Sequence, residues 1–216
     1  MSNEVKAIQT EYRGFKFRSR LEARWAVFFD ACGVKWEYEP EGYDLGDGLL
    51  YLPDFLLHDV TLGRDGKGDQ GNDLFVEVKG VMSYEDAAKV DRFAAKYPII
   101  VVTDIPANKD DAWEMAYDAE LKGGHTVFSF DTVDGDTYYA FPCVDIYGKF
   151  RLIGGDYTHN MDKEKTECAY QLARQARFEH GETLTIDEIQ SMMRENVARL
   201  KAKHAREAEE STKRAW

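Results

Sequence analysis

The chain has 216 residues with 40 acidic side chains against 28 basic ones, and its formal net charge of −12 argues against a protein that coats long stretches of nucleic acid. Hydrophobic residues make up 44% of the chain, which is enough for a core and excludes disorder throughout. Neither a membrane span of ~18 apolar residues nor an apolar N-terminal signal segment is visible, so we expect a cytoplasmic protein without a membrane partner.

The N-terminal part of the chain predicts a strand followed by a helix. Residues 12–18 alternate aromatic and polar side chains, which is typical of a short strand. Ser19 and Glu22 have the spacing of a capping box, and Gly33 is placed to end the helix that Ser19 begins. The apolar face of this helix consists of Leu21, Trp25, Phe28, Phe29 and Cys32.

Three further strands are expected to form a meander. Residues 34–40 read as a strand that Pro40 ends, and residues 74–80 read as a strong strand that Gly80 ends. Residues 49–57 read as a strand that contains a proline, which indicates an edge or a bulge.

The next segments alternate between helices and strands. The expected elements are a helix over 84–96 that Ser83 and Asp86 cap, a buried strand over 98–104, a helix over 110–122, and strands over 125–130 and 137–146. Together with the preceding elements, this order predicts the α/β class, with a mixed central sheet flanked by helices.

Two helices are expected after a glycine-rich link at residues 154–155. The first covers about 162–179, and the second runs from a capping box at Thr185 and Glu188 to about residue 208. The second helix has an apolar stripe that fits either the body of the protein or a second copy of the chain, as in a homodimer; its members are Ile186, Ile189, Met193, Val197 and Leu200. We therefore divide the chain into a domain at 1–153 and a C-terminal helical extension at 154–216.

One group of residues points to chemistry. Glu77 and Lys79 lie two positions apart in a predicted strand, so they project from the same face, while Val76 and Val78 face the core. If the two neighbouring strands pair as a hairpin, Asp54 reaches the same face. Two carboxylates beside one ammonium fit a site for a hard cation such as Mg²⁺, with the lysine holding water and offsetting negative charge on a phosphate.

These residues carry a family resemblance. Pro53–Asp54 followed by Glu77–Val78–Lys79 resembles the PD-(D/E)XK nuclease superfamily. The wider string YRGFKFRSRLEARWAVFFDACGVKWEYEPEGY…YLPDF…LFVEVKG is similar to small nucleases or nuclease-like proteins of phages and bacteria, over roughly residues 12–104. The resemblance implies a restriction-endonuclease-like fold and a phage-encoded, Mg²⁺-dependent DNA endonuclease, in which Mn²⁺ substitutes and which acts in the host cytoplasm.

The resemblance also implies a role for each site residue. Asp54 and Glu77 would ligate the metal together with the backbone carbonyl of Val78. Lys79 would activate or position the water that attacks phosphorus, with the 3′ oxygen leaving. Glu22, on the helix that precedes these strands, would complete the catalytic set.

Each of these residues also has a purely structural alternative. Asp54 after a proline could simply start a turn, and Glu77 with Lys79 could form an exposed ion pair, which contributes roughly 0–1 kcal/mol. Glu22 could serve only to cap the helix, with its carboxylate bonded to the Ser19 amide.

Several side chains around this group are ambiguous. Glu39 and Glu41 are expected to be ordinary loop carboxylates, and Tyr38 and Tyr51 to be core or rim aromatics. Five basic residues lie close to the predicted helix start, where the helix dipole disfavours cations. We interpret them as phosphate contacts, with a solvated helix start as the alternative; they are Arg13, Lys16, Arg18, Arg20 and Arg24.

Charge and cysteine patterns sharpen the choice of function. Residues 37–77 hold eleven acids and two bases, whereas residues 13–24 hold five bases and one acid, so the acidic surplus surrounds the proposed metal ligands. The three cysteines form no CxxC pair and support neither a disulfide framework nor a zinc site.

The main rival to a metal-dependent nuclease is a nuclease-fold accessory protein that binds nucleic acid or protein without cutting. A two-carboxylate glycosidase is a weaker alternative, because the lysine has no task there.

Overall fold

The structure is a computed structural model that describes residues 8–61, 71–108, 129–131, 137–139, 141–153, 160–178 and 184–214. Its largest sheet contains β3 (Lys35–Tyr38), β6 (Phe55–Val60), β7 (Asn72–Val78), β8 (Ile99–Val102), β9 (Ser129–Asp131) and β10 (Thr137–Tyr139). The spatial order is β10-β9-β8-β7-β6-β3, with β7 and β8 parallel and the other neighbours antiparallel. The predicted α/β class with a mixed sheet is confirmed.

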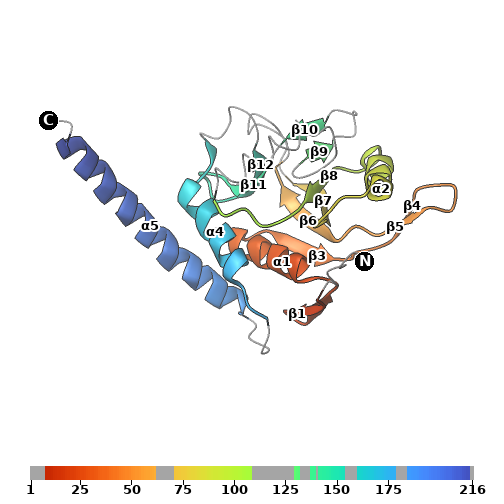
Figure 1. The fold of residues 1–216 in the computed structure, drawn as a ribbon, viewed down its shortest axis with the longest axis horizontal. Coiled ribbons are helices and arrows are strands. Elements are labelled where there is room, and N and C mark those ends of the chain that lie inside the picture. The colour runs from red at the N-terminus through yellow and green to blue at the C-terminus, as the bar shows by residue number, and fades with distance from the viewer. Residues whose placement is uncertain are drawn as a thin grey trace, which may run out of the picture.

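Helices cover both faces of this sheet (Figure 1). The described helices are α1 (Arg20–Cys32), α2 (Tyr84–Ala94), α4 (Lys163–Gln175) and α5 (Ile186–Arg214). Val76 of β7 lies in the larger apolar cluster with residues of α1 and α4, whereas Phe75 lies in a second cluster with Phe93 of α2. Successive residues of β7 therefore face opposite helical layers, as the period of a strand requires. None of the described helices is long and apolar enough to cross a membrane.

Helix α1 begins and ends where the sequence predicts. The Ser19 hydroxyl accepts a hydrogen bond from the Glu22 amide, and Gly33 ends the helix in the left-handed region with φ of 72°. Most of the helix is buried, and the indole of Trp25 donates to the carbonyl of Thr103 at 2.7 Å. This hydrogen bond ties α1 to the residue that follows β8, the neighbour of β7 in the sheet.

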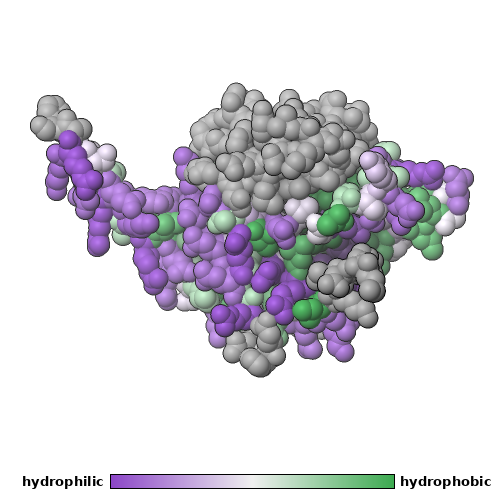
Figure 2. Space-filling model, viewed as in Figure 1, coloured by the Kyte–Doolittle hydropathy of each residue, from purple (hydrophilic) through white to green (hydrophobic). Residues whose placement is uncertain are grey.

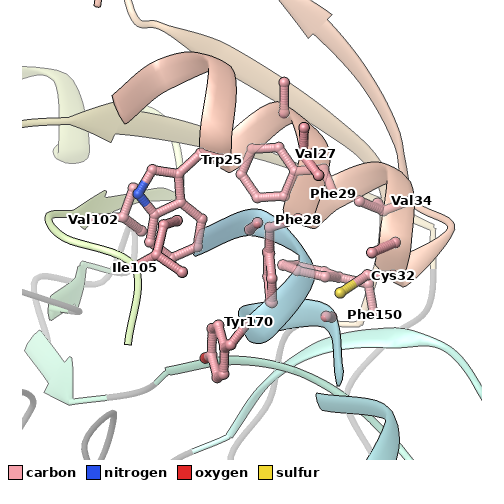
Figure 3. Packing of buried hydrophobic residues seen from close by; sticks show 14 of the residues in the cluster. Trp25, Val27, Phe28, Phe29, Cys32, Val34, Val102, Ile105, Phe150 and Tyr170 are labelled. Atoms are coloured by element: carbon pink, nitrogen blue, oxygen red, sulfur yellow. The ribbon is translucent and has the colours of Figure 1, made fainter. Parts of the chain in front are cut away.

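Helix α4 shares the core of α1. The ring of Tyr170 stacks on Phe28 with centroids 4.8 Å apart and planes 10° apart (Figure 3). The Tyr170 hydroxyl donates to the carbonyl of Pro142 at 2.5 Å. The core therefore continues from the N-terminal strands into the C-terminal segment.

The apolar stripe of α5 packs on the body of the same chain, except for Ile186 at its start, which is exposed. Ile189 and Met193 are buried, and Val197 and Leu200 are partly buried against the same cluster. From Lys201 onward the described residues of the helix are exposed, and the helix runs away from the body with hydrophilic side chains along it (Figures 1 and 2). The helix ends at Arg214, beyond the predicted end near residue 208.

Two predicted strands near the N-terminus are wrong in detail. Residues 12–18 do not form one strand, because β1 (Thr10–Tyr12) and β2 (Phe15–Phe17) form a hairpin whose turn residues Arg13 and Gly14 have φ of 52° and 81°. Two positive φ values are typical of the tight turns that suit hairpins. The predicted strand over 49–57 is also interrupted: its first part, β5 (Leu50–Tyr51), pairs with β4 (Tyr43–Asp44), and its second part enters the large sheet as β6.

The second half of the chain shows further differences. The predicted strand over 137–146 is divided into β10 and β11 (Phe141–Val144), and β11 pairs with β12 (Phe150–Ile153), a strand that the sequence analysis did not predict. Helix α4 ends at Gln175, before the predicted residue 179, because Ala176 leaves helical geometry with ψ of 127°. The predicted helix over 110–122 lies outside the described residues.

Tyr170→Ala should destabilise the whole domain and not only its C-terminal segment. The substitution removes a fully buried aromatic ring and a buried hydrogen bond, and losses of this kind cost about 3–5 kcal/mol. Urea unfolding followed by tryptophan fluorescence includes the α1 core in its signal, because Trp25 is one of the four tryptophans of the chain. Tyr147→Ala, at a tyrosine that is 80% exposed, is the control and should leave the midpoint unchanged. Two separate transitions in the wild type would contradict a shared core.

Candidate functional site

The pairing of β6 with β7 brings Asp54 and Glu77 together. Phe55 lies opposite Val76 in the antiparallel register, so Asp54, one residue earlier, lies opposite Glu77, one residue later. Directly opposed residues project from the same face of a sheet. The two carboxylates are only 3% and 4% exposed, so the structure places two acids in a nearly dry environment.

Asp54 is held through both of its oxygens. Its Oδ2 accepts the backbone N–H of Val78 at 2.7 Å, and its Oδ1 lies 2.5 Å from Nη2 of Arg18. Burial and the charge of Glu77 raise the pKa of Asp54 from its ordinary value of 3.8 to about 8, although the Val78 N–H and Arg18 act in the opposite direction. Asp54 is therefore a carboxyl group whose charged form lacks sufficient compensation.

Glu77 binds a phenol and an ammonium. Its Oε2 accepts the hydroxyl of Tyr51 at 2.7 Å, and its Oε1 lies 3.0 Å from Nζ of Lys79. The predicted common face of Glu77 and Lys79 is confirmed by this contact. Nζ also lies 3.4 Å from Asp86 at the start of α2.

Lys79 stays charged at neutral pH. Partial burial lowers its pKa, but the charge and hydrogen bond of Glu77 outweigh that effect, so the pKa is raised above its ordinary value of 10.5. A protonated lysine donates hydrogen bonds and cannot accept a proton. An ammonium group in this position could hold a bound group in place or stabilise negative charge, but it could not act as a base.

Glu22 holds the start of α1 in a way that differs from the prediction. Its carboxylate accepts the Ser19 hydroxyl at 2.7 Å, the Tyr38 hydroxyl at 2.6 Å and the backbone N–H of Arg18 at 3.1 Å, so the amide it binds is that of Arg18 and not that of Ser19. Glu22 is 6% exposed, and its charge contributes to the raised pKa of Asp54. It is thus a third buried carboxylate near the pair.

The five basic residues of the N-terminal segment have different surroundings. Arg18 enters the site, whereas Arg13 pairs with Asp30 at 2.6 Å and lies 5.2 Å above the ring of Trp36. Lys16 is exposed on the hairpin, and Arg20 and Arg24 are partly buried at the start of α1.

Four residues belong to the site although the sequence predicts other roles for them: core or rim aromatics for Tyr38 and Tyr51, an ordinary loop carboxylate for Glu39, and a helix cap for Asp86. The phenols of Tyr38 and Tyr51 bind the buried carboxylates, and Asp86 approaches Lys79. Glu39 pairs with Nε of Arg18 at 2.8 Å, and its amide donates to the carbonyl of Asp54 at 2.9 Å. Asp86 could have been placed near the site from the sequence, since it caps the helix that follows the Glu77–Lys79 strand. By contrast, Glu41 accepts a hydrogen bond from Tyr43 and takes no part in the site.

The donors at this site fit a hard cation. Within the described part of the chain, no three His, Cys, Asp or Glu side chains gather into a cluster that could hold a metal alone. Mg²⁺ does not require such a cluster, because it keeps several waters and needs only one or two carboxylates. Asp54 and Glu77 supply these. Val78 directs its N–H toward Asp54, and in an extended strand the carbonyl of the same residue points to the same edge.

A scan against protein-family models, a search of curated proteins and a search of solved structures gave no match for this chain. Function is therefore inferred from the chemistry of these side chains.

Proposed function

We propose that the protein is a Mg²⁺-dependent DNA endonuclease of the PD-(D/E)XK superfamily, with a restriction-endonuclease-like fold. One observation supports this most: Asp54 and Glu77 are both buried on one sheet face, and the pKa of Asp54 is raised to about 8. Burying an undercompensated carboxylate lowers stability, so a purely structural ion pair is a poor explanation for it. A cation bound between Asp54 and Glu77 would compensate their charges and so remove this loss of stability. A phage-encoded enzyme of this kind would act in the host cytoplasm.

In this proposal Asp54, Glu77 and the carbonyl of Val78 hold the cation, which when bound supplies Lewis-acid stabilisation of the phosphoryl oxygens. Lys79 donates hydrogen bonds to the attacking water and to the phosphate, and its positive charge offsets the negative charge that develops during attack. Tyr51 fixes one oxygen of Glu77, which leaves the other oxygen directed toward Lys79. Glu22 fixes the start of α1 and so places Arg18 at the site.

The proposal is tested by a cleavage panel of linear, nicked, single-stranded and four-way DNA with Mg²⁺, Mn²⁺ or EDTA. We expect cleavage of at least one form with either metal and none with EDTA. Absence of cleavage on every form, together with absence of Mn²⁺ binding by calorimetry, would favour the rival function of a non-cutting binding protein.

The ion pair between Arg18 and Asp54 is the observation that favours this rival, because an internal cation already occupies one ligand oxygen.

Divalent-cation binding should depend steeply on pH. Because protons compete for Asp54 below its pKa of about 8, affinity for Mn²⁺ should rise about tenfold per pH unit below that value and level off above it. Calorimetry in buffers of different ionisation enthalpy measures both the affinity and the protons released. Affinity that is flat across this range, with no proton release, would contradict Asp54 as a ligand.

A further inference from the structure

The side chain of Arg18 covers the candidate site on the side that faces solvent. Its Nη2 lies 2.5 Å from Oδ1 of Asp54, and its Nε lies 2.8 Å from Oε1 of Glu39. The side chain is nevertheless 56% exposed, whereas the side chain of Asp54 is almost fully buried. One guanidinium thus connects a buried carboxylate with a carboxylate at the rim.

The contact uses the Asp54 oxygen that a cation would need. Oδ2 already accepts the Val78 N–H, so Oδ1 is the oxygen that faces Arg18. A divalent cation bound at Oδ1 would lie within a few ångströms of the guanidinium. Two positive charges at that separation repel each other strongly where burial limits screening by water. Arg18 and the cation therefore compete for one atom.

Arg18 can leave Asp54 without unfolding its surroundings. Its backbone amide is fixed by Glu22 and Tyr38, so only the side chain has to move. Glu39 offers a second carboxylate that is closer to solvent, and the hydrogen bond that its backbone N–H donates to the Asp54 carbonyl holds the residue there. Glu39 has φ of 46°, a conformation that non-glycine residues adopt at a cost and that often marks functional sites.

We propose that Arg18 is an exchangeable counter-ion: it pairs with Oδ1 of Asp54 in the metal-free protein, is displaced from that oxygen by the divalent cation, and then offers its guanidinium to a phosphate oxygen of DNA beside Glu39. This inference rests on the proposed function. It predicts effects of opposite sign, because Arg18 weakens metal binding yet supports cleavage. An arginine that only stabilises the fold would not change metal affinity in this direction.

The test is a calorimetric titration of metal-free protein with Mg²⁺ alone, in which the wild type and the variants are compared over the same series of pH values so that competition by protons is separated from the effect of Arg18. Arg18→Met removes the charge but keeps the backbone contacts and most of the volume. Since an opposite charge changes the proton affinity of a carboxylate by about 10–1,000-fold, we expect Mg²⁺ to bind at least about tenfold more tightly to Arg18→Met than to the wild type. Cleavage of DNA by this variant should fall.

Arg13→Met is the matched control. Arg13 also pairs with a buried aspartate, Asp30, at 2.6 Å, but this pair is not part of the site. Its substitution should leave the Mg²⁺ affinity unchanged. Equal or weaker binding by Arg18→Met, with normal binding by the wild type, would overturn the counter-ion role and leave the proposed function standing. Failure of the wild type and of both variants to bind Mg²⁺ would overturn both.

A second measurement uses only the wild type, so it holds even if Arg18→Met fails to fold. The Nε–Hε resonance of Arg18 should be protected from solvent exchange in the metal-free protein, because Nε and Nη2 are both ion-paired. Saturation with Mg²⁺ should shift this resonance, because Nη2 loses Asp54 while Nε keeps Glu39, and the Arg13 resonance should stay unchanged. An Arg18 resonance that does not respond to saturating Mg²⁺ would contradict the displacement.

Discussion

Asp54→Asn should reduce Mg²⁺-dependent DNA cleavage by about 10³-fold or more, because it removes a charged ligand from the proposed metal site, whose cation would contribute several kcal/mol of transition-state stabilisation. Asparagine has nearly the same volume, and its side-chain carbonyl can still accept the Val78 N–H. The variant therefore separates the charge from the shape of the residue. Cleavage of the preferred DNA form, measured with excess Mg²⁺, gives the size of the loss.

The same substitution should stabilise the metal-free protein at alkaline pH. The pKa of Asp54 is raised in the folded state, so its contribution to stability is complete below the ordinary value of 3.8 and is lost as the pH rises through about 8. Above that pH the wild type carries a buried charge that asparagine never acquires. Thermal unfolding in EDTA should therefore show a higher midpoint for Asp54→Asn at alkaline pH and a smaller difference in acid. Arg18 retains Glu39 as a partner in the variant.

Asp73→Asn is a suitable control, since Asp73 also lies on β7 but its side chain is 57% exposed. It should leave both cleavage and the alkaline stability unchanged. Full cleavage by Asp54→Asn would exclude Asp54 as a metal ligand. Lower stability of Asp54→Asn at alkaline pH would mean that the ion pair with Arg18 outweighs the cost of burying the carboxylate.

The central part of the site could be predicted because its signals are local. The i and i+2 spacing of Glu77 and Lys79 fixes their common face as soon as the segment is a strand. The expected pairing of the two neighbouring strands as a hairpin then places Asp54 opposite Glu77, although the first of these strands begins later than predicted. The start and end of α1 were equally readable, because Ser19 and Gly33 act through their own backbone geometry.

The partners of these acids could not be predicted, because they depend on distant segments. Tyr51 reaches Glu77 only because the β4–β5 hairpin lies over the face of β7 that carries Phe75. Arg18 and Asp54 are 36 positions apart, and their contact depends on how α1 packs across the sheet. No periodicity or spacing encodes such contacts, although Arg18 lowers the pKa of Asp54 and occupies one of its carboxylate oxygens.

The predicted strands over 49–57 and 137–146 were wrong because a hydrophobic pattern does not specify how strands pair. Pro53 cannot donate to a ladder, so the apolar run over 49–57 is divided between two sheets even though its hydrophobicity is continuous. The predicted strand over 137–146 is also divided between two sheets. Its second part pairs with β12, whose short length gave little pattern to detect. The hydrophobic pattern therefore predicted the positions of the strands along the chain more reliably than it predicted the sheet that each strand joins.

Lys79→Met should lower cleavage by about 10²–10³-fold, the range observed when one preorganised donor is removed from an active site. Unlike Asp54→Asn, it should leave Mg²⁺ affinity unchanged or slightly tighter, because it removes a positive charge 3.0 Å from Glu77. Tyr51 would still hold the other oxygen of Glu77, so the ligand stays in place. Single-turnover cleavage and calorimetry with Mg²⁺ alone measure the two effects separately.

The controls for this experiment distinguish charge from position. Lys79→Arg keeps a cation and should retain part of the activity, and Lys96→Met, at an exposed lysine just beyond α2, should retain all of it. Because the pKa of Lys79 is raised, cleavage by the wild type should show no loss from lysine deprotonation until well into the alkaline range. A Lys79→Met variant that cleaves normally would remove the lysine from the mechanism. A variant that no longer binds Mg²⁺ would instead show that the ammonium serves to position Glu77, and that the driving force for attack comes from elsewhere in the site.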